Sequence, residues 1–246
     1  MKPFVAALFI LVLALPSHGQ VRRRTVHFPP APVVEIRDDF RFGDRGWVAG
    51  FADYSTLTTN MELDSGIRPL PQELVISGTG FMIAGNNHSD DLFMFLKKKL
   101  TAADGIRPRQ RYLIAYVITM ASNASANPSC TGIGGHPGLS VFFKAGGSAL
   151  EPLAEVTDTK EVRMNVDKGN QSTGGPAATV AGNIGNDSPL CSNTPFRTIV
   201  RTHVHSYEVE STPFGELWLL VGTDSGFEGK TVLYYQSINA TLTPRQ

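Results

Sequence analysis

The sequence predicts an all-β protein, an antiparallel β-sandwich or jelly roll with long loops rich in glycine and asparagine. Three observations support this fold class. Apolar and polar residues alternate in short segments, turn-forming residues separate these segments, and long amphipathic helical patterns with caps are missing. Many strands with almost no helices imply two packed antiparallel sheets, and an irregular barrel is the alternative architecture.

The start of the 246-residue chain has a pattern typical of export. Lys2 precedes an apolar stretch too short to span a bilayer, and small residues follow it. Residues 1–19 are therefore predicted to be a secretory signal peptide, with a buried N-terminal helix as the alternative. Residues 20–32, with three arginines and three prolines, are predicted to be an extended, exposed leader. We expect residues 33–246 to form a single β-sandwich domain of a secreted, extracytoplasmic protein that has no membrane span.

The composition excludes two classes of protein. The chain has 22 basic and 22 acidic side chains, and this balance argues against an electrostatic nucleic-acid-binding protein. Two cysteines are too few for a miniprotein built on disulfides. The large number of glycines and prolines, 24 and 16, indicates many turns.

The predicted strands follow from period-two alternation. Residues 161–167 alternate strictly and place three apolar side chains on one face: Val162, Met164 and Val166. Residues 231–242 place five on one face, with Gln236 interrupting the pattern: Val232, Tyr234, Ile238, Ala240 and Leu242. Further strands are predicted at residues 33–36, 47–51, 57–63, 74–76, 81–84, 92–96, 112–120, 139–144, 199–209 and 217–222. Turns are predicted at residues 64–66, 78–80, 104–105 and 146–147, and residues 97–103 form one short helical turn at most.

Two long loops, residues 122–138 and 168–195, each contain one cysteine. In an oxidising compartment we expect Cys130 and Cys191 to form a disulfide bond, with two buried free thiols as the alternative. The disulfide would close a loop of about 60 residues, which stabilises the fold by roughly 4 kcal/mol on the chain-entropy model. It would also join the two least regular segments, and loops on a rigid sandwich commonly carry binding residues.

Five segments resemble an uncharacterised family of secreted or lipid-anchored bacterial β-rich proteins. They are GFADY (50–54), GNNHSDDLFMF (85–95), GIGGHPG (132–138), MNVDKGNQS (164–172) and LWLLVGTDSGFEG (217–229). The resemblance covers most of the mature chain and implies export and one domain, but no mechanism. This chain lacks the cysteine that anchors lipid-bearing members. Separately, residues 38–47 and the closing aromatic strand are similar to the ends of extracellular carbohydrate-binding jelly rolls, a likeness of fold alone.

The first polar cluster precedes an apolar strand and contains four candidate ligand-binding residues, Asn87, His88, Asp90 and Asp91. Carboxylates and amides are the oxygen ligands that calcium prefers, and the same groups bind sugars. The structural alternative is a turn whose side chains bond their own backbone. We favour the turn because a single turn rarely supplies six calcium ligands.

The second polar cluster, Asp224 and Glu228, is predicted to lie on a glycine-flanked loop after an apolar strand. The two carboxylates are candidate calcium ligands, or an acid/base pair held in different environments. A hairpin loop in which Asp224 bonds backbone amides is the favoured structural alternative. A trypsin-like nucleophile loop is excluded because Thr223 and Phe227 stand where that loop needs glycine, and no segment supplies the base.

Three further features have a structural explanation that we favour over a functional one. His203 and His205 lie two apart on a predicted strand, a spacing that suits zinc, but an exposed sheet face is the simpler interpretation. Residues 132–138 lack the helix and lysine of a phosphate-binding loop. Trp47 and Trp218 are candidates for stacking on sugars, but Trp218 lies in an apolar run and is predicted to be core.

Two functions from different classes follow. The favoured one is a non-catalytic module that binds a glycan or cell-surface polymer through the loops that hold Asn87, His88, Asp90, Asp91, Asp167, Asn170, Asp224 and Glu228, with calcium as the candidate cofactor. The alternative is a polysaccharide hydrolase that uses two carboxylates across one cleft, Asp91 and Glu228. A structural envelope protein without a small ligand is a third possibility. We favour binding because the sequence shows no complete set of catalytic residues.

Overall fold

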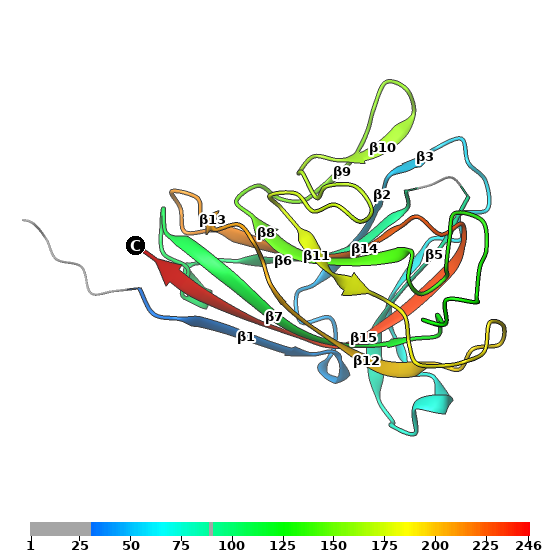
Figure 1. Ribbon diagram of the computed structural model, residues 1–246. Coiled ribbons are helices and arrows are strands. Elements are labelled where there is room, and N and C mark those ends of the chain that lie inside the picture. Colours follow the sequence, from blue (N-terminus) through cyan, green and yellow to red (C-terminus); the bar gives the residue numbers. More distant parts are fainter. Residues whose placement is uncertain (1–30, 89–90) are drawn as a thin grey trace, which may run out of the picture. The chain divides into compact units, whose positions relative to one another are not determined.

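The computed structural model describes residues 31–88 and 91–246 (Figure 1). The predicted signal peptide, residues 20–30 of the predicted leader and the candidate Asp90 lie outside the described residues. Residues Ala31–Gln246 form one compact unit. No helix in this described part of the chain is long and apolar enough to cross a membrane.

Regular structure in the described residues is almost entirely β-strand. The strands are β1 Val34–Asp39, β2 Val48–Ala52, β3 Tyr54–Ser55, β4 Asp64–Pro69, β5 Thr79–Asn87, β6 Phe93–Leu100, β7 Arg111–Ser122, β8 Val141–Ser148, β9 Ala154–Val156, β10 Glu161–Met164, β11 Thr179–Asn183, β12 Arg197–Val204, β13 Val209–Glu210, β14 Leu217–Ser225 and β15 Gly229–Arg245. The single-turn 3-10 helices are η1 Phe40–Phe42, η2 Gln72–Leu74 and η3 Ala102–Asp104. The predicted all-β class is confirmed.

The strands form two large antiparallel sheets and a small third one. Sheet A has the order β12-β7-β15-β5-β4, with β1 also paired to β15 and β13 to β7. Sheet B has the order β11-β8-β14-β6-β2, and sheet C has the order β3-β10-β9. Figure 1 shows sheet B between sheet A, below it, and the strands of sheet C, above it. The two large sheets make the predicted sandwich, and sheet C adds a third layer.

The main core lies between sheets A and B and follows the predicted alternation. On β7, four alternating side chains point inward: Ile114, Tyr116, Ile118 and Met120. Full burial of an aliphatic side chain of this size stabilises a fold by about 1.5–3 kcal/mol. These inward positions hold β7, and through it the neighbouring strands, against sheet B.

The interruption predicted at Gln236 is a β-bulge. The pairing of β15 with β7 shifts register between Tyr235 and Ser237. An extra residue reverses the alternation, so the inward set before the bulge is Leu233 and Tyr235. The prediction that Val232 and Tyr234 share a face with Ile238, Ala240 and Leu242 is therefore wrong, whereas the last three are buried as predicted.

Much of sheet B is buried on both faces, because sheet C and the chain that follows it cover part of its outer face. The second core holds Phe93 and Phe95 of β6 and Leu220 of β14, packed against Val162 of β10. A strand covered on both sides needs apolar residues at successive positions, which explains the unbroken run at the start of β14.

The two tryptophans occupy different environments. Trp47 is buried, and its indole Nε1 donates a hydrogen bond of 2.8 Å to Asp38. Trp218 is only partly buried, between the core residues Leu217 and Leu219, and the ammonium groups of Lys97 and Lys99 lie 5.3 and 5.9 Å from its ring. The prediction that Trp218 belongs to the core is wrong, because alternation places it on the outer face of sheet B.

Several local predictions fail where tertiary pairing overrides residue preference. The predicted strand at 57–63 is irregular chain, and the one at 74–76 starts in η2. The turn signals at 64–66 and 146–147 instead lie in β4 and β8. The predicted loop at 168–195 contains β11, and the predicted strand at 199–209 is split into β12 and β13. The turn at 104–105 is confirmed, since Gly105 caps η3 with a left-handed backbone.

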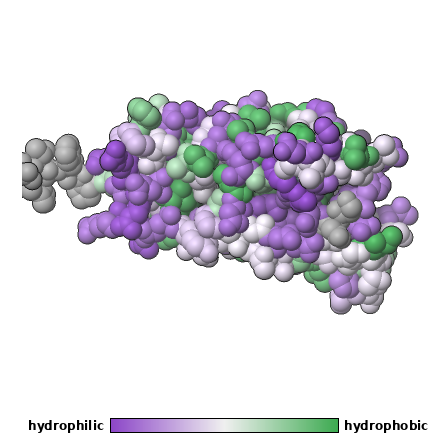
Figure 2. Space-filling model, turned by 90° about the horizontal axis from the view of Figure 1, so that it is seen from above, coloured by the Kyte–Doolittle hydropathy of each residue, from purple (hydrophilic) through white to green (hydrophobic). Residues whose placement is uncertain are grey.

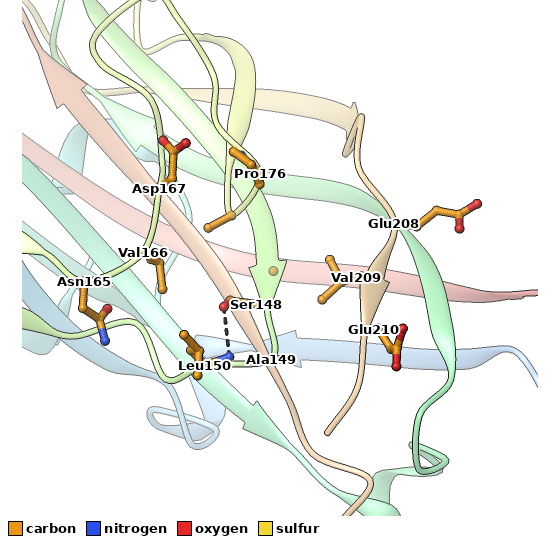
Figure 3. Close-up of a pocket in the computed structure, with 12 residues that line it drawn as sticks. Ser148, Ala149, Leu150, Asn165, Val166, Asp167, Pro176, Glu208, Val209 and Glu210 are labelled. Atoms are coloured by element: carbon orange, nitrogen blue, oxygen red, sulfur yellow. Dashed lines mark hydrogen bonds between the residues drawn. The ribbon is translucent and has the colours of Figure 1, made fainter. Parts of the chain in front are cut away.

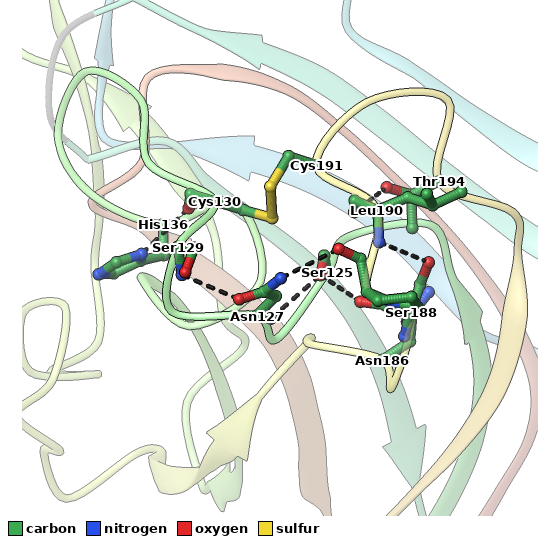
Figure 4. Close-up of a disulfide and its surroundings, with 11 residues drawn as sticks. Ser125, Asn127, Ser129, Cys130, His136, Asn186, Ser188, Leu190, Cys191 and Thr194 are labelled. Carbon is green, nitrogen blue, oxygen red and sulfur yellow. Dashed lines mark hydrogen bonds between the residues drawn. A yellow bond between two sulfur atoms is a disulfide. The ribbon is translucent and has the colours of Figure 1, made fainter.

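The predicted disulfide bond between Cys130 and Cys191 is present and joins the two long loops (Figure 4). Hydrogen bonds beside it hold the same loops together. The Ser125 hydroxyl donates to the Ser188 carbonyl, and Asn127 Nδ2 donates to the Pro189 carbonyl at 3.0 Å. These loops are therefore ordered against each other by side chains as well as by the covalent bond.

We expect the double substitution Cys130→Ser and Cys191→Ser to lower the free energy of unfolding by about 2–4 kcal/mol, because the unfolded chain regains the freedom of a long loop. Urea denaturation without reductant measures the change. As a control, reductant should bring the wild-type protein to the level of the variant and leave the variant unchanged. Equal stability of the two proteins would contradict the assigned role.

Candidate functional site

A buried ion pair lies on the outer face of sheet B. Lys144 on β8 and Asp224 on the neighbouring β14 are both fully buried, and Lys144 Nζ lies 2.7 Å from Asp224 Oδ2. Successive residues of a strand point to opposite faces, and Phe143 belongs to the core between sheets A and B. Lys144 therefore points away from that core, toward the layer formed by sheet C and the loop after it.

A second lysine extends the pair into a row of charges. Lys168 Nζ lies 2.7 Å from Asp224 Oδ2 and 2.7 Å from Asp53 Oδ2, and it sits 4.9 Å from the centre of the Phe93 ring. Lys144, Asp224, Lys168 and Asp53 alternate in sign, and we call these four residues the buried ion chain. Two cations balance two anions, so each buried charge has a partner in place of the water it lost.

The loop of residues 168–173 is bonded directly to this chain. Lys144 Nζ donates to the carbonyls of Lys168 and Thr173 at 2.9 and 2.8 Å, so with Asp224 all three of its N–H groups have acceptors. The Gln171 backbone N–H donates to Asp224 Oδ2 at 2.9 Å. Gln171 and Asp53 have left-handed φ angles of 45° and 59°, a conformation that non-glycine residues adopt only where contacts enforce it.

The two lysines have pKa values shifted in opposite directions. Burial lowers the pKa of Lys144, and the attraction of Asp224 offsets this only in part. Burial also acts to lower the pKa of Lys168, but Asp224 and Asp53 together outweigh it and raise that pKa above its usual value. Lys168 therefore stays protonated at neutral pH and cannot serve as a general base.

A cleft of about 300 Å³ lies above the buried ion chain. We call it the polar cleft, and its lining is Asp53, Asp91, Arg163, Met164, Val166, Asp167, Lys168, Gly169 and Asn170. Asp91 Oδ1 accepts a bond of 2.9 Å from Gln171 Nε2, and Asp167 Oδ1 accepts one of 2.8 Å from the Gly169 amide. The lining of the polar cleft thus combines side chains held by hydrogen bonds with exposed polar groups. Figure 2 shows polar residues over much of the surface when the molecule is seen from above.

The structure brings together three of the predicted ligand-binding residues. Asp91, Asp167 and Asn170 line the polar cleft, although they come from two separate segments of the chain. Asp224 lies beneath it in the ion chain, since it shares Lys168 with the lining residue Asp53. The segments singled out in the sequence around residues 91, 168 and 224 therefore meet at one place.

Three other predicted residues do not line the polar cleft. Asn87 is buried, and its Nδ2 donates to the carbonyls of Ser225 and Phe227 at 3.1 and 3.0 Å, which ties β5 to the turn after β14. His88 is exposed and contacts the Asn60 carbonyl. Glu228 follows that turn, and its backbone amide donates to a neighbouring loop at Ile133.

Asp224 lies within β14 and not on the loop predicted for it. Its Oδ2 faces two ammonium groups and an amide, so this oxygen is not available to a cation. In the described part of the chain, no group of three or more His, Cys, Asp or Glu side chains is placed to hold a metal ion. The calcium site predicted at Asp224 and Glu228 therefore has no support in the geometry.

Sequence reasoning missed Asp53 and Arg163 as members of the site, and it included Lys168 only as the first residue of a candidate loop. A signal for the buried ion chain was present: Lys144 and Asp224 each interrupt an apolar strand. A charge inside an apolar run requires a buried partner of opposite sign, and these two residues are such partners for each other.

The two histidines predicted on an exposed sheet face are instead packed inward. Thr179 Oγ1 lies 2.7 Å from His203 Nε2 and 3.0 Å from His205 Nδ1, while His205 Nε2 lies 3.0 Å from the Pro176 carbonyl. A carbonyl only accepts, so His205 carries its proton on Nε2, and the Thr179 hydroxyl donates to Nδ1. Burial lowers the pKa of both histidines, and their contacts with Thr179 connect β11 to the end of β12.

No family model matches the chain, and no curated protein matches its sequence. Among solved structures, it is similar to a mannan-recognising carbohydrate-binding module at 9% identity and a TM-score of 0.36, over 88% of this chain and 100% of that one. An adhesin domain of Lys-gingipain from Porphyromonas gingivalis is 8% identical, with a TM-score of 0.35 over 86% and 99% of the two chains. A cyclase from Fischerella is 14% identical, with a TM-score of 0.34 over 87% and 90%. Likeness at this level carries no argument about what the chain binds.

We expect Asp224→Ala to lower the free energy of unfolding by about 3–5 kcal/mol, because Lys144 loses its only carboxylate partner and Lys168 one of two. Urea denaturation measures the change. The matched control is Asp187→Ala, which removes an exposed aspartate from an ion pair with Arg197 and should change stability little.

The double variant Lys144→Met with Asp224→Leu tests whether the loss of stability in Asp224→Ala comes from an unbalanced buried charge. It removes one cation and one anion and leaves Lys168 paired with Asp53, so it should be more stable than Asp224→Ala. A double variant less stable than Asp224→Ala would show that charge balance is not what the site requires.

We expect the protein to lose stability on mild acidification through His203 and His205. Their pKa values are lowered in the folded state, so the unfolded chain binds the protons more readily. Their contribution is complete above about pH 6.5 and is lost as the pH falls through the lowered folded values. Unfolding free energies measured between pH 7 and 5 should fall less steeply for His205→Gln than for the wild type. His88→Gln, at an exposed histidine, is the control, and equal slopes for wild type and His205→Gln would refute the assignment.

Proposed function

We propose that this protein is a non-catalytic binding module that takes up a glycan in the polar cleft. The observation that supports this proposal most directly is that the buried, charge-balanced ion chain holds the lining of the polar cleft in place. Arg163, Asp167 and Asn170 present a guanidinium, a carboxylate and an amide at the exposed part of the lining. These planar groups donate and accept hydrogen bonds in fixed directions, as recognition of sugar hydroxyls requires.

Rigidity of the lining supports binding over catalysis. A ligand site that is ordered in advance loses less conformational entropy when it binds. The loop of residues 168–173 is held by Lys144 and Asp224 from below, and Asp53 is held by Lys168. The same contacts hold the carboxylates of Asp53 and Asp224 in ion pairs with Lys144 and Lys168.

The hydrolase alternative relied on Asp91 and Glu228 facing each other across one cleft. Asp91 lines the polar cleft and Glu228 does not. The disulfide bond between Cys130 and Cys191 supports an oxidising compartment, and hence export, because such bonds persist outside the cytosol. The proposed ligand is therefore an extracellular glycan or cell-surface polymer.

We expect Arg163→Ala and Asn170→Ala each to weaken glycan binding about tenfold, which corresponds to the loss of one good hydrogen bond or about 1.4 kcal/mol. A glycan array identifies the bound sugars, and titration calorimetry measures the affinities. The matched control is Arg197→Ala, at a comparably exposed arginine outside the polar cleft, which should bind like the wild type. Binding should also survive a chelator.

Two results would count against the proposal. One is the absence of binding to any glycan on the array, which would favour the structural envelope protein. The other is turnover of a bound glycan that Glu228→Gln abolishes, which would favour the hydrolase.

A further inference from the structure

A second hollow adjoins the polar cleft. It has a volume of about 340 Å³, and we call it the adjoining cleft (Figure 3). Its lining is Gly147, Ser148, Ala149, Leu150, Asn165, Val166, Asp167, Pro176, Ala177, Glu208, Val209 and Glu210. Val166 and Asp167 line both clefts, so the two hollows meet along this short stretch of chain.

The walls of the adjoining cleft are held as firmly as those of the polar cleft. Asn165 Oδ1 accepts from the Leu153 amide at 2.8 Å, and its Nδ2 donates to the Glu151 carbonyl at 2.9 Å. On the opposite wall, the Pro176 carbonyl accepts from His205 Nε2. The Ala177 amide donates to the Asp167 carbonyl at 2.8 Å, which joins that wall to the shared stretch.

The chemistry of the adjoining cleft differs from that of the polar cleft. Leu150, Val209 and Pro176 supply apolar surface, and Leu150 is 66% exposed. The charged lining residues are carboxylates: Asp167, Glu208 and Glu210. Glu208 is directed outward in Figure 3, and its carboxylate pairs with Arg111 at 3.1 Å and with Arg245 at 3.4 Å. Apolar surface beside carboxylates suits a sugar ring, which has an apolar face and a hydroxylated edge.

We propose that the two clefts are successive subsites for one linear glycan that passes over Asp167, and that this glycan carries no acidic groups. The inference rests on the proposed function. Each cleft alone is at the small end of the range for ligand pockets, so a short ligand fills only one of them. A longer chain that reaches the second cleft gains contacts without a second entropic cost of association.

Charge excludes acidic polymers. Together the two linings hold five carboxylates, Asp53, Asp91, Asp167, Glu208 and Glu210, and two cations, Arg163 and Lys168. Glu208 is balanced from outside the linings by Arg111 and Arg245, so two negative charges remain unbalanced. A surface of this sign repels uronic acid chains and other polyanions and tolerates neutral or amino-bearing sugars.

The test measures affinity against chain length by titration calorimetry. The probes are mannose, xylose and N-acetylglucosamine oligomers of one to six units, with galacturonic acid oligomers of the same lengths as the acidic counterpart. We expect at least one neutral series to bind at least tenfold more tightly at six units than at two, and the acidic series to bind more weakly at every length.

Leu150→Ala locates the second subsite. This variant removes exposed apolar surface from the adjoining cleft, so it should reduce the gain in affinity from the two-unit to the six-unit oligomer. Leu190→Ala, at an exposed leucine outside both clefts, is the matched control and should behave like the wild type. Asn170→Ala should weaken short and long oligomers alike.

The outcomes separate this inference from the proposed function. A neutral series bound with equal affinity at all lengths, or a preference for the acidic series, would overturn the inference and leave the glycan-binding module intact. No binding of any series would overturn the inference, and no binding to any glycan on the array would overturn the proposed function as well. A gain with length that Leu150→Ala leaves unchanged would place the additional contacts elsewhere and refute the adjoining cleft as a subsite.

Discussion

The contact between Asp224 Oδ2 and two lysine ammonium groups is the constraint on which the site depends. Such an arrangement is costly to build, because each ion gives up its water, and it is stable only when every charge and every N–H group has a partner. Lys144 meets that condition with three acceptors, and Lys168 meets it with two carboxylates and the Gly169 carbonyl. These contacts fix the relative positions of strands in sheet B and of the loop after β10, because all of them meet at one point.

This tie explains why a sandwich carries a third layer. Sheet C and the chain that follows it supply the apolar cover for Phe93, Phe95 and Leu220, and that cover excludes water from the ions. The polar and apolar parts of the outer face of sheet B therefore depend on each other. The clefts lie at the margin of this cover, where buried contacts give way to exposed side chains such as Asn170 and Asp167.

Much of the fold could be predicted from the sequence, because burial of one face of a sheet makes apolar residues recur at every second position. The inward residues of β7 and the cysteine pair follow from alternation and compartment alone. The bulge at Gln236 was visible only as an interruption, since its effect depends on the partner strand. The strands β4 and β8 contain turn-forming residues at 64–66 and 146–147, and they exist because neighbouring strands pair with them. Within the site, Asp91, Asp167, Asn170 and Asp224 were found by type, whereas Asp53 and Lys168 join them only through long-range packing.

The central position of β15 in sheet A has a consequence for how the protein forms. This strand pairs with β1, β5 and β7, so sheet A is incomplete without residues 229–245. Contacts so distant along the chain slow the search for the native topology. Assembly of sheet A therefore depends on β15, the strand that links β1, β5 and β7.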